Sequence, residues 1–464
     1  MFAKFKQAKP FRPQFSIGCL FDIATGRYEK GMKGENILNG GVANIEGVTG
    51  PGNSFKSTIA HFRMLKVLLN YVVATGFMYD TENSATLSRL KDLANVIDPS
   101  GALASSLDDE ELQRFLFTDA AEYNGSDWWA LFKEGVIERI EKLKEIDTPF
   151  LNVKTNECYK LLPPMVGEID SFSQFQTAAV FKKVETGKVG ESELNSVSMQ
   201  NSNGKAQLLD TLPYLTSKGG FTMILTAHMG DTIVMDQYNG PKKKLAFVKA
   251  TRKMKKTTES FTFLTNNLFE VIDAKPMFDN NKQPEFPRDD NDDLKGMTDL
   301  MELTVMPIRT KGGITGFPFS LVVSQRFGLQ ETLSEYWYLK TYGRFGLTGN
   351  QVQQRLALLP DVVFTRKSIR RISQENAKFR RASQLLSELC QINNLWPEYA
   401  IENMVEPTKL YEGLKEKGYD WDELLETRGH WTFDQYTNPV KYLSAKDLLE
   451  MYHGNYHPYW MAAK

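Results

Sequence analysis

The sequence predicts an α/β fold with a mostly parallel sheet flanked by helices, followed by a mainly helical C-terminal domain. Over residues 41–330, short apolar runs of strand length alternate with longer stretches that have helical spacing of apolar side chains. Such alternation is typical of an α/β fold. From about residue 330 onward, aromatic-rich helical periodicity replaces it. These observations predict three parts: an N-terminal arm and oligomerisation segment at 1–40, the α/β core at 41–330 and the helical domain at 331–464.

Composition limits the classes of protein that fit. The length of 464 residues provides ample core, and the hydrophobic fraction of 41% is ordinary for a soluble protein. Because the net charge is −1, a polyanionic partner would depend on local clusters of charge. Three widely spaced cysteines predict no disulfide framework and fit a reducing cytoplasm, and the five histidines lack zinc-ligand spacing. We expect neither a signal peptide at 1–13 nor a membrane span, since no run approaches 18 apolar residues.

The first functional pattern is the Gly-rich stretch Gly50-Pro51-Gly52-Asn53-Ser54-Phe55-Lys56-Ser57-Thr58, between a predicted strand at 42–48 and a predicted helix at 59–69. Small residues let successive backbone N–H groups point at one anion, and the helix N-terminus adds partial positive charge. Lys56 can then reach the β- and γ-phosphates of a nucleotide, and Ser57 can hold Mg²⁺. Because Phe disfavours the left-handed conformation, we expect the loop to close at Phe55 in an ordinary one. The alternative is a plain turn before a helix.

Two buried strands are predicted to end in acidic residues. Residues 71–80 lead into Asp80-Thr81-Glu82, and residues 161–169 lead into Asp170-Ser171. Ligands bind at the carboxyl ends of strands in open α/β sheets. Glu82 is therefore a candidate base that orients an attacking water, or else a helix cap, and Asp170 is a candidate for orienting Mg²⁺. Between the strands we expect helices at 87–96, 108–116 and 127–146.

A basic segment follows the next predicted strand. Residues 185–207 predict a mobile loop, residues 206–215 a helix, and residues 221–227 a strand that ends at His228. His228 is either a γ-phosphate sensor or a satisfied core histidine. Residues 241–258 contain no acidic residue, and phosphate-backbone binding needs such density, so we expect a DNA-binding segment that orders only with ATP and DNA. A solvated surface is the alternative. The candidate contacts are Lys242, Lys243, Lys244, Lys249, Arg252, Lys253, Lys255 and Lys256.

The rest of the core predicts a strand at 268–273, a flexible insertion at 275–299 and a hairpin formed by residues 301–308 and 319–323. The connection of the hairpin carries Arg309 and Lys311, which are candidates for neutralising a γ-phosphate in trans or else a solvated tip. In the C-terminal domain we expect helices at 368–390, 408–417 and 444–452. The basic helix at 366–381 is a second candidate for guiding DNA.

Taken in order, these segments resemble the RecA-fold ATPases, and within them the phage recombinases of the UvsX type. The resemblance covers roughly residues 15–330 and rests on SIGCLFDIATG, GPGNSFKST, FMYDTENSAT, GEIDS, LPYLTSKGGFTMILTAHMGDT and Arg309-Thr310-Lys311. It implies that Phe55 is a family trait and that Glu82 is the catalytic glutamate. It also implies that Asp170 is the Walker B aspartate and His228 the sensor. Arg309 and Lys311 would reach the ATP of a neighbouring copy.

The resemblance implies a DNA-dependent ATPase recombinase that uses ATP and Mg²⁺. Such a protein would assemble on single-stranded DNA as a helical filament, rather than a ring, and would promote pairing and strand exchange with homologous duplex DNA in recombination and repair. A hexameric DNA helicase of the DnaB type shares the core and the basic hairpin and is the alternative. A degenerate phosphate-loop protein that serves as a scaffold is the third interpretation.

Overall fold

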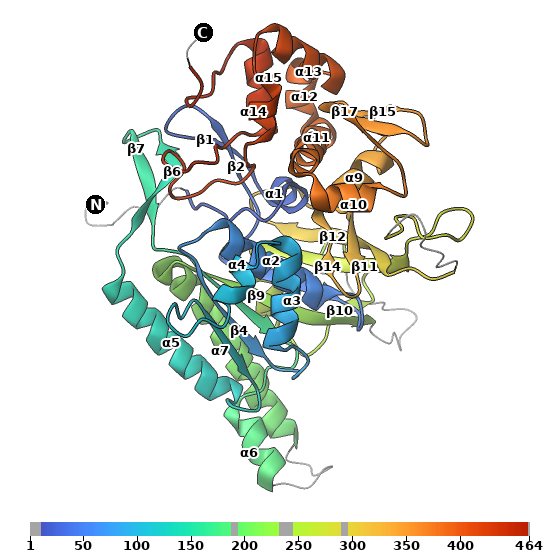
Figure 1. Ribbon diagram of the computed structural model, residues 1–464. Helices are drawn as coiled ribbons and strands as arrows, with labels where there is room; N and C mark the ends of the chain where they lie inside the picture. The colour runs from blue at the N-terminus through green and yellow to red at the C-terminus, as the bar shows by residue number, and fades with distance from the viewer. Residues whose placement is uncertain (1–10, 187–193, 232–244, 289–295, 463–464) are drawn as a thin grey trace.

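The computed structural model describes residues 11–186, 194–231, 245–288 and 296–462. Within them, the central feature is a 10-stranded sheet with the order β14-β13-β12-β11-β3-β9-β8-β4-β5, and β10 pairs with β9 (Figure 1). Six neighbouring strands are parallel: β11 (Asn267–Pro276), β3 (Ile45–Gly50), β9 (Phe221–Asp231), β8 (Met165–Asp170), β4 (Thr75–Asp80) and β5 (Phe115–Asp119). The antiparallel strands are β12 (Leu300–Thr310), β13 (Phe319–Ser324), β14 (Gly328–Leu329) and β10 (Arg252–Met254).

Helices cover both faces of the sheet (Figure 1). One face packs against α2 (Lys56–Asn70) and α3 (Leu87–Ile97), and the other against α5 (Gly125–Lys142), α7 (Leu194–Gly219) and α8 (Glu259–Leu264). Strand β4 shows the division, because Met78 joins the first hydrophobic cluster and Phe77 and Tyr79 join the second. The short helices α1 (Cys19–Thr25), α4 (Ala102–Ser106) and α6 (Ala178–Thr186) complete this part.

The C-terminal region is mainly helical, with α11 (Ala377–Leu395) at its centre (Figure 1). Around it lie α9 (Glu331–Thr341), α10 (Ile369–Glu375), α12 (Pro397–Asn403), α13 (Pro407–Glu416), α14 (Trp421–Leu425) and α15 (Ala445–His453). A small antiparallel sheet adds β15 (Leu347–Gly349), β16 (Gln354–Leu356) and β17 (Leu359–Phe364). The predicted fold class, a mostly parallel sheet flanked by helices with a mainly helical C-terminal region, is confirmed.

The C-terminal region packs on the beginning of the described chain. The Trp431 indole N–H donates to the carbonyl of Gln14 (2.9 Å), and the backbone N–H of Asn36 donates to Oδ1 of Asp447 (2.8 Å). Asn36 belongs to the hairpin of β1 (Arg27–Lys30) and β2 (Asn36–Asn39). One hydrophobic cluster runs from Phe15 to Met451, so the core is continuous across residues 40 and 330. The division at those two residues stays a prediction.

Several predicted elements differ from the structure. Residues 108–116 were expected to be helical, but Asp109 accepts hydrogen bonds from the backbone N–H groups of Glu111 and Leu112, and such a turn competes with a helix. The chain then enters β5. The strand expected at 161–169 is divided between β7 (Glu157–Leu161) and β8, because Pro163 and Pro164 cannot donate to a sheet. Strand β7 pairs with β6 (Ile146–Asn152).

Two segments that the sequence predicts to be loops, 185–207 and 275–299, are ordered where the structure describes them. Most of 185–207 belongs to α6 and α7, because tertiary packing of α7 outweighs its weak helix formers, whereas residues 187–193 lie outside the described chain. The insertion at 275–299 is anchored on both sides of its undescribed residues 289–295: Met277 and Phe286 are buried. The helix expected at 368–390 is interrupted at Asn376, whose side chain caps α11.

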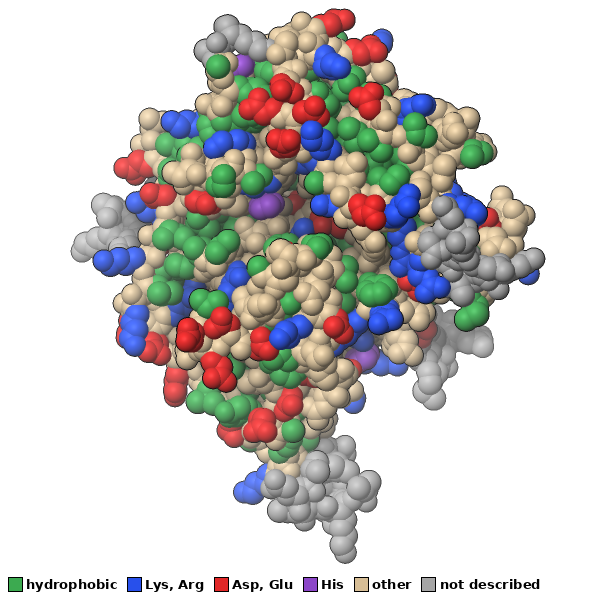
Figure 2. Space-filling model, viewed as in Figure 1, with side chains coloured by type: hydrophobic (Ala, Val, Ile, Leu, Met, Phe, Trp, Pro, Cys, Tyr) green, Lys and Arg blue, Asp and Glu red, His purple; other side chains and the backbone are tan. Residues whose placement is uncertain are grey.

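The surface facing the viewer in Figure 2 intermingles acidic and basic side chains, in keeping with a net charge of −1. Among the described residues, no helix combines the length and the apolar character needed to cross a bilayer.

Two glycines give opposite predictions for stability. A Cβ at Gly167 in β8 would lie 1.7 Å from the ring of Phe77, whose centroid is 4.7 Å from that of Phe132 in α5. Because this ring cannot move away freely, Gly167→Ala should lower the free energy of unfolding by about 1–3 kcal/mol. At Gly135 in α5 a Cβ meets nothing within 4 Å, so Gly135→Ala should raise it by about 0.5–1 kcal/mol. Urea denaturation of both variants measures the difference, and equal effects would contradict the packing at Gly167.

Candidate nucleotide-binding site

The parallel register brings the predicted site residues to one edge of the sheet. Gly50, the last residue of β3, pairs with His228 of β9, and Asp80, the last residue of β4, pairs with Asp170 of β8. Strands β3, β9, β8 and β4 are neighbours, so the phosphate-loop candidate and the acidic residues meet at adjacent carboxyl ends. Strand β9 continues to Asp231, so His228 lies within the strand and not at its end, as the sequence had indicated.

The Gly-rich loop joins β3 to α2. Ser54 donates its hydroxyl to the carbonyl of Pro51 (2.8 Å), which closes the loop, and Lys56 begins α2 with 6% of its surface exposed. Helix α2 has no side-chain cap at its N-terminus. Backbone N–H groups at an uncapped helix N-terminus favour an anion there.

The expectation that Phe55 avoids the left-handed conformation is wrong. Its backbone has φ 61° and ψ 18°. A bulky residue in this region is strained by about 1–2 kcal/mol. The partly buried Phe55 side chain packs against the hydrophobic core, which offsets the strain.

Asp80 shapes the turn that presents Glu82. Its buried carboxylate accepts hydrogen bonds from the backbone N–H groups of Glu82 (2.9 Å), Ser84 (2.8 Å) and Ala85 (2.7 Å). Three backbone donors fix the chain immediately after β4. Asp80 therefore acts on the site through the position of Glu82.

Glu82 is held by two donors on one oxygen. Its Oε1 accepts a hydrogen bond from Ser171 Oγ (2.6 Å) and another from His228 Nε2 (2.8 Å). Burial alone would raise the pKa of Glu82. These hydrogen bonds and the nearby Lys56 cation lower the pKa by more than burial raises it, so the net shift is downward. Glu82 is therefore an anchored carboxylate at neutral pH. Within the described chain, Oε2 has no hydrogen-bond partner, which leaves it available to a water.

Sequence reasoning missed Ser171 as a partner of Glu82. Thr81 fixes it, since the N–H of Ser171 donates to Thr81 Oγ1 and that hydroxyl donates back to the Ser171 carbonyl, both at 2.8 Å. The only available signal was the hydroxyl residue directly after Asp170. Two strand-end dipeptides, Thr81-Glu82 and Asp170-Ser171, thus form one hydrogen-bonded unit.

Asp170 and Ser57 could hold Mg²⁺. Asp170 is buried and accepts a hydrogen bond from Thr226 Oγ1, and Ser57 lies in the first turn of α2 next to Lys56. A carboxylate and a hydroxyl are hard oxygen ligands of the kind that Mg²⁺ prefers. The donor set therefore fits the ion that a phosphate loop normally uses.

A second polar group lies beneath the loop. His61 Nδ1 donates to Glu168 Oε1 (2.8 Å), and both side chains are buried close to Asp170. Burial opposes the charge on His61, yet the Glu168 carboxylate raises the pKa of His61 to about 9, and burial raises the pKa of Glu168 to about 6. The two groups form an ion pair at neutral pH that fastens α2 to β8. An acidic residue inside an apolar strand was its only signal in the sequence.

The basic segment is described only from residue 245, so Lys242, Lys243 and Lys244 lie outside the described residues. Arg252 forms an ion pair with Glu270 (2.7 Å) that gives it a structural role. Lys249, Lys253, Lys255 and Lys256 are exposed. Residues 252–254 form β10 against β9, and the expectation that residues 241–256 order only with ATP and DNA stays a prediction.

Arg309 and Lys311 do not lie with the other site residues. Arg309 pairs with Leu268 at the amino end of β11, whereas Gly50 lies at the opposite, carboxyl edge of the parallel strands. Its guanidinium donates to the carbonyls of Thr265 (3.2 Å) and Phe263 (3.1 Å). Burial lowers the pKa of Lys311, and the nearby charges of Arg309 and Arg12 lower it further. Arg12 is a member of this basic group that sequence reasoning missed.

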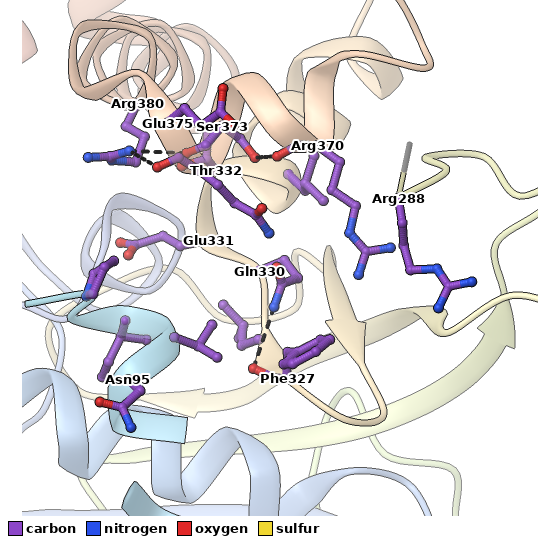
Figure 3. A pocket seen from close by; sticks show the side chains of 16 residues that line it. Asn95, Arg288, Phe327, Gln330, Glu331, Thr332, Arg370, Ser373, Glu375 and Arg380 are labelled. Carbon is purple, nitrogen blue, oxygen red and sulfur yellow. Dashed lines mark hydrogen bonds between the residues drawn. The ribbon is translucent and has the colours of Figure 1, made fainter. Parts of the chain in front are cut away.

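A cavity of about 640 Å³ lies between α3, the β13–β14 turn, α9 and α10, and contains none of the predicted catalytic or nucleotide-binding residues (Figure 3). Basic side chains in and near this cavity belong to the helix predicted at 366–381, a candidate for guiding DNA, and their contacts bear on that role. Arg370 forms two hydrogen bonds with Asp299 (2.8 and 2.7 Å), Arg380 donates to the carbonyls of Ser373 and Gln374, and Arg366 pairs with Asp279. These contacts give Arg366, Arg370 and Arg380 structural roles, and a DNA-guiding role for the remaining basic residues of 366–381 stays a prediction.

Comparisons with known proteins give little further information. No family model matches the chain, and no curated protein matches it. One solved structure, titled "Crystal structure of the RadB recombinase", is 15% identical with a TM-score of 0.34, over 64% of this chain and 94% of that chain. At this identity and TM-score, the similarity does not indicate a function for this chain.

The left-handed Phe55 gives a prediction for nucleotide binding. Phe55→Gly should keep the affinity for ATP within about threefold of the wild type, because Gly adopts φ 61° without strain. Phe55→Val should weaken binding by about tenfold or more, since a β-branched residue resists this region and would distort the loop. Titration with a fluorescent ATP analogue measures both. Equal affinities of the two variants would show that the left-handed backbone is not needed for binding.

Proposed function

We propose that this protein is a RecA-like ATP hydrolase that acts as a DNA-dependent recombinase. It assembles on single-stranded DNA and promotes pairing and strand exchange with homologous duplex DNA. The observation that carries the proposal is the anchored Glu82 carboxylate, held by Ser171 and His228 beside the phosphate loop, with the basic segment attached to the same strand as His228.

The phosphate loop binds ATP. Backbone N–H groups of the loop would surround the phosphates, Lys56 would contact the β- and γ-phosphates, and Ser57 and Asp170 would hold Mg²⁺. Mg²⁺, when bound, neutralises charge on the β- and γ-phosphate oxygens. The buried pair of His61 and Glu168 keeps the start of α2 at a fixed distance from β8.

Glu82 orients the attacking water. Its Oε1 is occupied by Ser171 and His228, so Oε2 accepts the hydrogen bond from water and positions it in line with the bond that breaks. The lowered pKa of Glu82 keeps it ionised at neutral pH, as an acceptor must be. Water adds to the γ-phosphorus as the bond to the ADP oxygen breaks, and the proton of the water leaves through Glu82 or the product phosphate.

The basic segment binds the DNA backbone. Lys249, Lys253, Lys255 and Lys256 of the described part, with Lys242, Lys243 and Lys244, supply the cations, and Arg252 is left out because of its pair with Glu270. Contacts with phosphate carry no base information, which suits a protein that acts on any homologous pair.

Arg309 and Lys311 act on the nucleotide of a second copy. They lie at the opposite edge of the sheet from their own phosphate loop, so a role at a γ-phosphate requires assembly. An interface that joins two different edges is heterologous and generates a ring or an open helical filament. We favour the filament, and the ring-forming helicase of the DnaB type is the second candidate because it uses a basic group in the same way.

Glu82 gives the first test. Glu82→Gln should bind ATP like the wild type but hydrolyse it about 10²-fold more slowly, because the amide keeps the size of the side chain and cannot accept the proton. Steady-state ATPase assays and nucleotide titrations separate the two properties. Glu122→Gln, an exposed position after β5, is the matched control and should behave like the wild type. Normal turnover by Glu82→Gln would remove Glu82 from the catalytic role.

Electron microscopy gives the second test. With single-stranded DNA and a slowly hydrolysed ATP analogue, the wild type should form helical filaments. Lys56→Ala should not, because it cannot hold the nucleotide that completes the interface. Closed rings would favour the helicase, and the absence of any assembly would favour a scaffold protein.

A further inference from the structure

A four-residue turn follows β8 and touches both halves of the proposed mechanism. The turn comprises residues 171–174, and the N–H of Gln174 donates to the carbonyl of Ser171 (3.0 Å) to close it. It begins directly after Asp170. We refer to it as the 171–174 turn.

On the nucleotide side, the turn contacts Glu82 and His228. Ser171 donates its hydroxyl to Glu82 (2.6 Å), and Ser173 Oγ accepts a hydrogen bond from the backbone N–H of His228 (2.9 Å). If Glu82 or His228 shifts when ATP binds, these hydrogen bonds would therefore move the 171–174 turn as well.

On the DNA side, the same turn contacts the basic segment. Ser173 donates its hydroxyl to the carbonyl of Lys255 (3.0 Å), and Lys256 Nζ donates to Gln174 Oε1 (3.2 Å). The N–H of Lys255 also donates to the carbonyl of His228 (2.8 Å). One hydroxyl, that of Ser173, thus bridges the backbones of His228 and Lys255.

Lys205 of α7 links the 171–174 turn to the basic segment through a third set of hydrogen bonds. Its ammonium donates three hydrogen bonds of 3.0 Å, to the carbonyls of Phe172, Ser173 and Lys256. An ammonium has three N–H donors, so all are used. The side chain is 3% exposed, and burial, together with the charge of Lys256, lowers its pKa to about 8.

A buried ammonium at this position costs free energy that an apolar side chain would not. Desolvating a cation is unfavourable, and a Met of similar length would pack there without that cost. What the ammonium alone provides is a three-way link between the 171–174 turn and the basic segment. The ammonium contacts none of the side chains proposed to bind nucleotide or DNA, since all three acceptors are backbone carbonyls.

We propose that Lys205 is a positioning residue that couples the nucleotide site to the basic segment by tying the 171–174 turn to the backbone of Lys256. The inference rests on the proposed function, because it assumes that ATP and DNA bind at the two ends of this link. Coupling between two binding sites is reciprocal: DNA strengthens ATP binding by the factor by which ATP strengthens DNA binding.

The test compares Lys205→Met with Lys218→Met, an exposed lysine on the same helix, as the matched control. ATP hydrolysis is measured with and without a homopolymer single strand, and affinity for that strand is measured with and without a slowly hydrolysed ATP analogue. Lys205→Met should keep DNA-independent turnover and nucleotide-free DNA affinity within about twofold of the wild type. Both the stimulation of hydrolysis by DNA and the gain in DNA affinity from nucleotide should fall by about fivefold or more.

A purely structural role for Lys205 predicts another pattern, in which all four quantities fall together in proportion to the unfolded fraction. That pattern, or wild-type coupling in folded Lys205→Met, would overturn the inference. If Lys205→Met does not fold at the assay temperature, as read by its thermal melt, Ser173→Ala carries the test with the same expected losses, and wild-type coupling in it overturns the inference. A wild type whose hydrolysis ignores DNA would overturn the proposed function itself.

Discussion

The parallel register of the central sheet is the constraint on which the candidate site depends. Because β3 pairs with β9 and β8 with β4 in register, Gly50 lies opposite His228 and Asp80 lies opposite Asp170 at one edge of the sheet. A slip of one residue would turn every side chain of a strand to the other face. Ser171 would then lose Glu82, and Asp170 would face the helices on the wrong side of the sheet. The alternation of Met78 and Phe77 between two hydrophobic clusters opposes such a slip.

The buried ion pairs add a second level of fixation. His61 and Glu168 join α2 to β8 beneath the phosphate loop. Arg63, about two turns into α2, pairs with Glu46 of β3, and both are fully buried. A buried pair contributes little net stability, but its geometry is narrow, because a displaced partner leaves a charge unpaired. Helix α2 is therefore fixed to β3 and β8, the strands that end in Gly50 and Asp170.

Much of the fold and of the candidate site could be predicted from the sequence. The features that could not be predicted depend on long-range contacts. The Gly-rich loop and the acidic strand ends are local patterns, and residues 50–58, Asp80 and Asp170 were found in that way. Lys205 and Arg12 carry no local signal, and Ser171 only its place directly after Asp170, because their roles depend on partners many residues away. The conformation of Phe55 was mispredicted because packing of its ring outweighed its backbone preference.

The contact between the two ends of the described chain also bears on how the protein is made. Asn36 and Asp447 are 411 residues apart, yet they share a buried hydrogen bond. At the usual speed of translation, about 5–20 residues per second, the partner of Asn36 leaves the ribosome roughly 20–80 seconds later. During that interval the apolar surface around Ile37 and Leu38 has no cover from Tyr442 and Leu448. The nascent chain therefore passes through a long period in which its own C-terminal region does not yet shield this apolar surface.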